Sequence, residues 1–255
     1  MDFMSNQLTD SADVTGPSEG GLQVLPFYIL CDEGGSMAGA SIVAVNEGIK
    51  QLFKTIYSDP ILDGNAWVSI IAFSDTADVV LPLSQATNVS TVPGCVVRGS
   101  SSYSAAFRKL REQIDIDVPN LKAYGFSVLK PIVFFVSDGE PNLEPWEVDY
   151  KLLTDISNKY RPHIISFGVE GANPDTIKKI ATCFPESYVK PITWIAESET
   201  SAVPEMIKLF KSLLSCYYSD HIEDEASPQY PLVQLPDGGV EIRGGSRRPS
   251  IDWRQ

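Results

Sequence analysis

Residues 25–36 read LPFYILCDEGGS, and this stretch decides the fold. An almost unbroken apolar run ends at Asp32, which is typical of a strand buried on both faces. Apolar residues then recur at helical spacing, namely Ile42, Val45, Ile49, Leu52, Phe53 and Ile56. The stretch therefore predicts a buried strand that leads into an amphipathic helix.

The alternation of strand and helix continues downstream. Further strands are predicted at 67–73, 78–81, 131–136, 164–169 and 188–195, and helices at 106–114, 145–160, 174–183 and 203–217. Strands that alternate with helices form a mainly parallel sheet covered on both faces. We predict a doubly wound α/β fold with a six-stranded sheet, in which the strand at 78–81 is an antiparallel edge strand.

The two ends of the chain differ from its middle. Residues 1–22 contain four acidic residues and no Lys or Arg, and we expect a disordered leader there. Residues 220–255 contain a possible β-hairpin around Pro236-Asp237-Gly238-Gly239. Packing on the domain, disorder and partner binding all remain open for this extension. The folded domain is predicted to span residues 23–219.

Composition excludes several classes of function. The chain has 33 Asp and Glu against 20 Lys and Arg, a net charge of −13. Nucleic acids and anionic membranes attract clustered cations, so neither is expected as a main partner. No apolar run is long enough to span a membrane, and the first residues do not resemble a secretory signal. Four scattered cysteines show no zinc or redox spacing, and we expect a cytoplasmic protein with reduced thiols.

Three polar segments carry the candidate chemistry. Asp32-Glu33-Gly34-Gly35-Ser36 follows the first strand, Gly99-Ser100-Ser101 precedes a helix, and Asp138-Gly139 follows the strand at 131–136. The carboxyl ends of parallel strands meet at one edge, where such sheets bind ligands. Carboxylate and hydroxyl oxygens suit Mg²⁺, whereas the segments lack the softer ligands Cys and His. Each segment taken alone could also be an ordinary turn or helix cap.

On these residues the chain resembles the von Willebrand factor A (vWA) domain, and in particular its bacterial TerY-like branch. That family has a metal-ion-dependent adhesion site built from an Asp-x-Ser-x-Ser loop, a Thr in a later loop and an Asp in an Asp-Gly turn. Asp32 and Ser36 match the ends of the first loop, Ser101 falls where the Thr would be, and Asp138 matches the later Asp. The resemblance implies that these four residues hold Mg²⁺ or Mn²⁺.

The sequence departs from this pattern at Gly34, where the family has a ligating Ser. Ser101 in place of Thr keeps the hydroxyl, but Gly34 has no side-chain oxygen. Water could fill the position, because Mg²⁺ readily keeps several waters. We predict a weakened metal site, or one filled when a partner supplies an acidic ligand. A metal-free vWA scaffold stays an alternative.

The resemblance implies a non-enzymatic adaptor or scaffold that binds a protein partner through an acidic residue. For the TerY-like branch it implies a bacterial stress-response, tellurite-resistance or phosphorylation-linked system. The rival is a serine hydrolase, because Ser36, Asp138 and His163 occur in the order found in α/β-hydrolases. However, Ala38 stands where the hydrolase turn needs Gly, and His163 is expected at the opposite edge of the sheet. Trp146 could line the metal site or pack at a helix start.

Overall fold

The computed structural model describes residues 22–58, 65–169, 171–182, 193–196, 198 and 202–208. Its strands are β1 (Gln23–Asp32), β2 (Ala66–Phe73), β3 (Ala77–Gln85), β4 (Ser127–Val128), β5 (Ile132–Ser137), β6 (His163–Gly168) and β7 (Thr193–Ile195). Its helices are η1 (Gly35–Met37), α1 (Ala40–Ser58), η2 (Ala86–Asn88), α2 (Tyr103–Ala123), α3 (Glu147–Thr154) and α4 (Pro174–Ile180), and residues 202–208 are also helical. The predicted α/β class is confirmed.

The sheet is mainly parallel, with the order β3-β2-β1-β5-β6-β7. β3 pairs antiparallel with β2 at one edge, as predicted for the strand at 78–81. β1 lies in the middle, parallel to both β2 and β5. The strands that follow β1 in the chain, β2 and β3, lie on one side of it. The chain then crosses through α2 to β5, β6 and β7 on the other side. Strand order therefore reverses beside β1, and such a switch point is where doubly wound sheets bind ligands.

The sheet has seven strands rather than the predicted six. The additional strand is β4, which consists of two residues and pairs with the start of β1. A strand this short has no apolar period in the sequence, which is why the sequence pattern did not reveal it.

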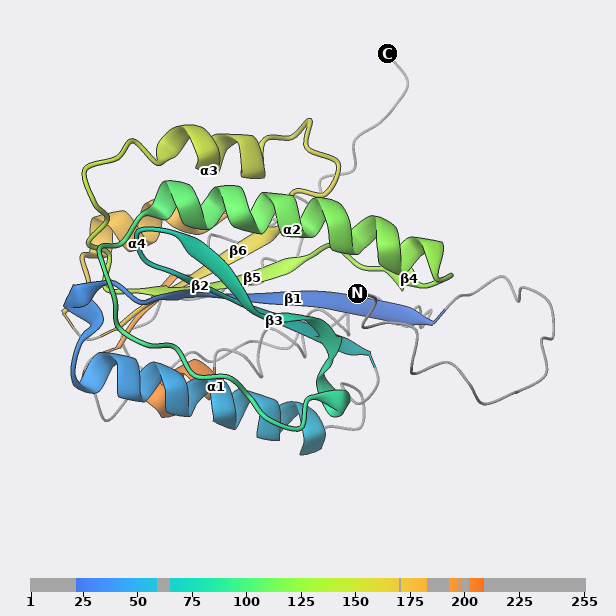
Figure 1. Ribbon diagram of the computed structural model, residues 1–255, viewed down its shortest axis with the longest axis horizontal. Coiled ribbons are helices and arrows are strands. Elements are labelled where there is room, and N and C mark those ends of the chain that lie inside the picture. The colour runs from blue at the N-terminus through green and yellow to red at the C-terminus, as the bar shows by residue number, and fades with distance from the viewer. Residues whose placement is uncertain are drawn as a thin grey trace, which may run out of the picture.

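Helices cover both faces of the sheet (Figure 1). α1 packs on one face, whereas α2, α3 and α4 pack on the other. Alternate residues of β1 enter the two cores: Phe27 and Ile29 face α1, while Tyr28 and Leu30 face α2. This double coverage explains the continuous apolar run in the sequence.

Several sequence predictions lie outside the described residues. They include the leader up to residue 21, the extension 220–255, and parts of the predicted strand at 188–195 and helix at 203–217. Among the helices that the structure describes, none has the length and apolar character needed to cross a bilayer.

Candidate metal site

Asp32 is the centre of a buried hydrogen-bond network at the carboxyl end of β1. Its side chain has no solvent exposure. Oδ1 accepts hydrogen bonds from the Gly34 amide (2.8 Å) and the Ser101 hydroxyl (2.8 Å), and Oδ2 accepts one from the Ser137 hydroxyl (2.6 Å). Two of the predicted site residues, Asp32 and Ser101, are therefore in direct contact although 69 positions separate them.

The segment before α2 holds Ser101 in place. The Ser102 side chain caps α2 by accepting a hydrogen bond from the Ala105 amide. The Gly35 amide donates to the Gly99 carbonyl (3.0 Å), which joins this segment to the loop after β1. Because caps and loop contacts fix the backbone, the Ser101 hydroxyl is aimed at Asp32 rather than at solvent.

Asp138 follows β5 at the same edge of the sheet and is 8% exposed. Its Oδ1 accepts a hydrogen bond from the Glu140 amide (3.0 Å). Its Oδ2 is the one buried side-chain oxygen or nitrogen, within the part of the chain that the structure describes, that has no hydrogen-bond partner. A buried carboxylate oxygen without a partner is costly, so it marks a position where a ligand or cation belongs.

The turn after Asp138 depends on glycine. Gly139 has φ of +77°, a conformation that side chains rarely adopt. A Cβ there would also lie 2.9 Å from the Asn173 carbonyl oxygen. The Asp-Gly pair seen in the sequence is thus required by the turn that positions Asp138.

Ser137 is a site residue that the sequence interpretation missed. Its hydroxyl donates to Asp32, accepts from the Gly139 amide (3.0 Å), and contacts the Tyr103 hydroxyl (2.6 Å). It therefore connects β1, α2 and the Asp138 turn. The available signal was its place as the last residue of an apolar strand, directly before Asp138.

Ser36 lies on η1 and is exposed to solvent. It is two residues from Gly34, but it is not part of the hydrogen bonds around Asp32 described above. Of the four predicted ligands, the structure thus links Asp32 and Ser101 by a hydrogen bond, places Asp138 beside Ser137, and leaves Ser36 at the rim.

Burial changes the acidity of Asp32. Desolvation raises its pKa from 3.8 to about 6, while the hydrogen bonds from Ser137, Gly34 and Ser101 oppose the rise. The nearby charge of Asp138 contributes a smaller part of the rise. The carboxylate of Asp32 is therefore held in a place that disfavours its negative charge.

Glu33, next to Asp32, links the end of β1 to the segment at residues 96–98. Its buried carboxylate accepts hydrogen bonds from the Val96 amide (2.6 Å) and from Arg98 Nε (2.7 Å). Arg98 also reaches Asp78 on β3 (3.1 Å). These contacts fasten the segment that leads to Ser101 against the end of β1.

The position of the Ser101 side chain explains why residue 34 is a glycine. A Cβ at this position would lie 2.0 Å from the Ser101 hydroxyl oxygen and 3.2 Å from Ser101 Cβ. The backbone itself would tolerate a side chain, since φ is −56°. Ser101 thus occupies the space that a side chain at residue 34 would use.

We expect Gly34→Ser to destabilise the fold, because Ser101 has to rotate and lose its hydrogen bond to Asp32. The free energy of unfolding should fall by about 1–2 kcal/mol in urea denaturation. The substitution exchanges one hydroxyl for another, so Mg²⁺ affinity should not rise.

Gly35→Ser is the matched control for that experiment. A Cβ at Gly35 would make an ordinary 3.4 Å contact with the Gly99 carbonyl oxygen. Its effect on stability should stay within about 0.5 kcal/mol. Equal losses in both variants would contradict the steric explanation.

His163 lies far from this edge. It pairs with Ile132 at the start of β5, whereas Gly168 pairs with Ser137 at its end. Five residues of strand span about 17 Å. His163 is therefore at the amino edge of the sheet, as expected from the sequence, and does not approach Ser36.

Trp146 is part of the core and does not line the site. It is 7% exposed and packs at steep ring angles against Tyr103, Phe107 and Tyr150. Of the two alternatives for this residue, packing at the helix start is the one observed.

Comparison with known proteins identifies the fold. No family model and no curated protein matches the chain. A von Willebrand factor type A protein from Catenulispora acidiphila matches with a TM-score of 0.56 and 15% identity, over 75% of this chain and 42% of that one. The chain has the vWA fold. The vWF domain of the type V pili tip protein Mfa5 from Porphyromonas gingivalis also matches, with a TM-score of 0.53 and 7% identity, over 76% of this chain and 96% of that one.

A pilus adhesin, SpaC from Lactobacillus rhamnosus GG, matches with a TM-score of 0.59 and 14% identity. That match covers 78% of this chain and 30% of the adhesin. This chain thus spans less than half the length of the Catenulispora protein and the adhesin. At such identities the likeness establishes the fold alone, and the TerY-like branch stays a prediction.

The residues at the carboxyl edge of the sheet fit a hard divalent cation. Ser101 donates its proton to Asp32, so its oxygen lone pairs remain able to face a cation. Asp138 Oδ2 is buried without a hydrogen-bond partner. Among the described residues no three His, Cys, Asp or Glu side chains gather as a metal cluster.

Proposed function

We propose that this vWA domain is a non-enzymatic protein-binding module whose carboxyl edge holds Mg²⁺ or Mn²⁺. The observation that carries the proposal is Asp138 Oδ2, a buried carboxylate oxygen without a hydrogen-bond partner beside the Asp32 network. Asp32, Ser36, Ser101 and Asp138 are the residues that would hold the ion. Gly34 leaves one position of its octahedron to water.

Hydroxyl ligands carry no charge, so a cation held partly by hydroxyls keeps more of its positive charge. That charge favours an acidic group on the partner. Asp32 is shielded by the Ser101 and Ser137 hydroxyls and the Gly34 amide. When bound, Mg²⁺ supplies an electrophilic position that accepts a carboxylate oxygen from the partner. Ser36, exposed on η1, lies where a partner would approach.

The setting of this module is part of the proposal. We place it in the cytoplasm of a bacterium, in a stress-response or phosphorylation-linked system such as tellurite resistance, as the TerY-like resemblance implies. The distance between His163 and the Ser36 loop supports a binding role over a serine hydrolase.

The test is a Mg²⁺ titration of the wild type and of Asp138→Asn. Mg²⁺ at about 10 mM should raise the free energy of unfolding by about 1.4 kcal/mol for a Kd near 1 mM. This corresponds to a rise in Tm of roughly 3–5 °C for a domain of this size. Asp138→Asn should lose the response, because the amide removes the charge that holds the ion.

Asp115→Asn is the matched control, since it removes the same charge from an exposed position on α2. Its Mg²⁺ response should equal that of the wild type. A response that persists in Asp138→Asn, or that is missing in the wild type, would refute the metal site. The latter result would leave a metal-free scaffold.

A further inference from the structure

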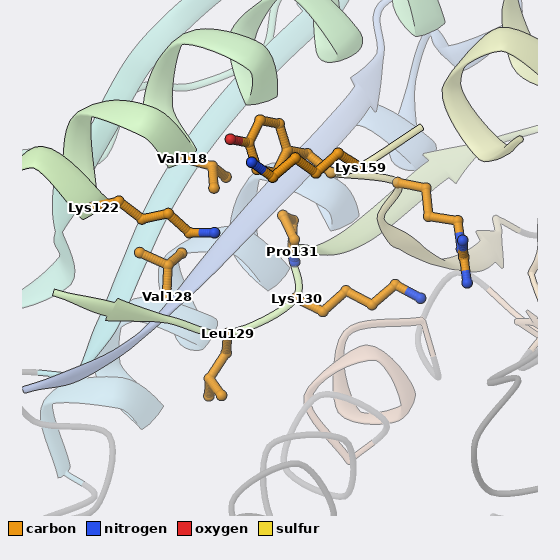
Figure 2. A pocket seen from close by; sticks show the side chains of 9 residues that line it. Val118, Lys122, Val128, Leu129, Lys130, Pro131 and Lys159 are labelled. Carbon is orange, nitrogen blue, oxygen red and sulfur yellow. The ribbon is translucent and has the colours of Figure 1, made fainter. Parts of the chain in front are cut away.

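A separate cavity lies at the opposite edge of the sheet. It has a volume of about 300 Å³ and is lined by Val118, Lys122, Val128, Leu129, Lys130, Pro131, Lys159, Tyr160 and Arg161. These residues come from the end of α2, from β4 and the segment that joins it to β5, and from the segment before β6 (Figure 2). The site around Asp138 follows the far end of β5, about 20 Å along the strand.

Four of the nine lining residues are cationic, in a chain whose net charge is −13. Figure 2 shows Lys122 and Lys159 extending toward one another above Val128 and Pro131. Their ammonium nitrogens lie 5.3 and 5.2 Å from the centre of the Tyr160 ring. Arg161 donates a hydrogen bond to the Ile156 carbonyl. An aromatic face and a carbonyl oxygen hold these side chains in place without cancelling their charges.

The positive field of the cavity reaches a neighbouring buried side chain. The pKa of His163 is lowered to about 3, first by burial and then by the charges of Lys130 and Arg161. Concentrated positive charge of this kind attracts anions.

We propose that this cavity binds a small organic phosphate. The phosphoryl group would contact Lys122, Lys130 and Lys159. A phosphoryl dianion carries two negative charges and can pair with several cations, whereas a carboxylate carries only one. The remainder of the ligand would rest on the apolar wall formed by Val118, Val128, Leu129 and Pro131. The volume is at the lower end of the range for small-molecule pockets.

The test uses phenyl phosphate, inorganic phosphate and phenol as probes, in buffer with EDTA so that no divalent cation is bound. Calorimetry should show that phenyl phosphate binds roughly tenfold more tightly than either fragment, which corresponds to about 1.4 kcal/mol. Lys122→Gln together with Lys159→Gln should weaken the binding of phenyl phosphate by about tenfold or more. Lys130→Gln alone should weaken it by a smaller factor.

Lys50→Gln together with Lys54→Gln is the matched control, because it removes two charges from exposed positions on α1, over the other face of the sheet. Its affinity for phenyl phosphate should match the wild type, and thermal unfolding should verify that every variant is folded. Equal affinity in the two double variants would overturn the proposal. So would phenyl phosphate binding no more tightly than phenol, or an absence of saturable binding up to about 10 mM.

Discussion

Asp32→Asn should abolish the Mg²⁺ response and leave the protein at least as stable as the wild type at pH 7 without metal. The reason is that the folded structure raises the pKa of Asp32 from 3.8 to about 6. At pH 7 the buried carboxylate is charged in a place that disfavours charge. The shift sets an upper limit of about 3 kcal/mol on the stability that a neutral isostere can recover.

The hydrogen bonds around Asp32 permit this exchange. An Asn carbonyl can accept from the Gly34 amide and the Ser101 hydroxyl, as Oδ1 does now. The Asn amide can donate to the Ser137 hydroxyl, which then donates its own proton to the Tyr103 hydroxyl. The contact between Ser137 and Tyr103 allows either oxygen to be the donor. The three groups that donate to Asp32 therefore each keep a hydrogen-bond partner.

Asp32→Ala separates charge from hydrogen bonding. It removes the acceptor for Gly34, Ser101 and Ser137 and opens a small cavity, so we expect a loss of about 2–4 kcal/mol in urea denaturation. Both variants should lose the Mg²⁺ response. If Asp32→Asn is as unstable as Asp32→Ala, the charge of Asp32 stabilises the fold and our account of the site is wrong.

Much of the fold was predictable because the strands are buried on both faces. The apolar runs at β1 and β5 are continuous and end at Asp32 and Ser137, and those at β2 and β6 are each interrupted by a single serine. Burial of both faces leaves little freedom in where such a strand begins and ends. β4 was not predictable, because two residues carry no period.

The place of the candidate site could be predicted, whereas its contacts could not. Asp32 and Asp138 could be placed at one edge because the carboxyl ends of parallel strands coincide. The role of Gly34 could not, because it depends on the Ser101 side chain filling the space beside it. The same holds for Ser137 and for the Glu33–Arg98 ion pair, whose partners are distant in sequence.

The pH dependence of stability should separate Asp32 from His163. Asp32 has a raised pKa, so the folded state binds more protons than the unfolded state between about pH 4 and 6. Its contribution to stability therefore falls as pH rises through this range. The pKa of His163 is lowered from 6.5 to about 3, so the unfolded state binds more protons there. Its contribution rises with pH.

Each group alone changes the free energy of unfolding by up to about 1.4 kcal/mol per pH unit between pH 4 and 6, with opposite signs. In the wild type the two slopes largely cancel. Relative to the wild type, Asp32→Asn should gain about 1.5 kcal/mol between pH 4.5 and 6, and His163→Gln should lose about 2 kcal/mol.

Urea denaturation at pH 4.5, 5.2 and 6 without Mg²⁺ provides the measurement. The remaining carboxylates are common to all three proteins, so they cancel in the differences. Packing lost in His163→Gln lowers the free energy of unfolding equally at every pH. It shifts the plot of this free energy against pH without changing its slope, so the comparison of slopes is not affected. Parallel curves for the three proteins would show that neither group titrates differently in the folded and unfolded states. Divergence in the expected directions would show that burial raises the pKa of Asp32 at the carboxyl edge and lowers the pKa of His163 at the amino edge, where the Lys130 and Arg161 charges add to the effect.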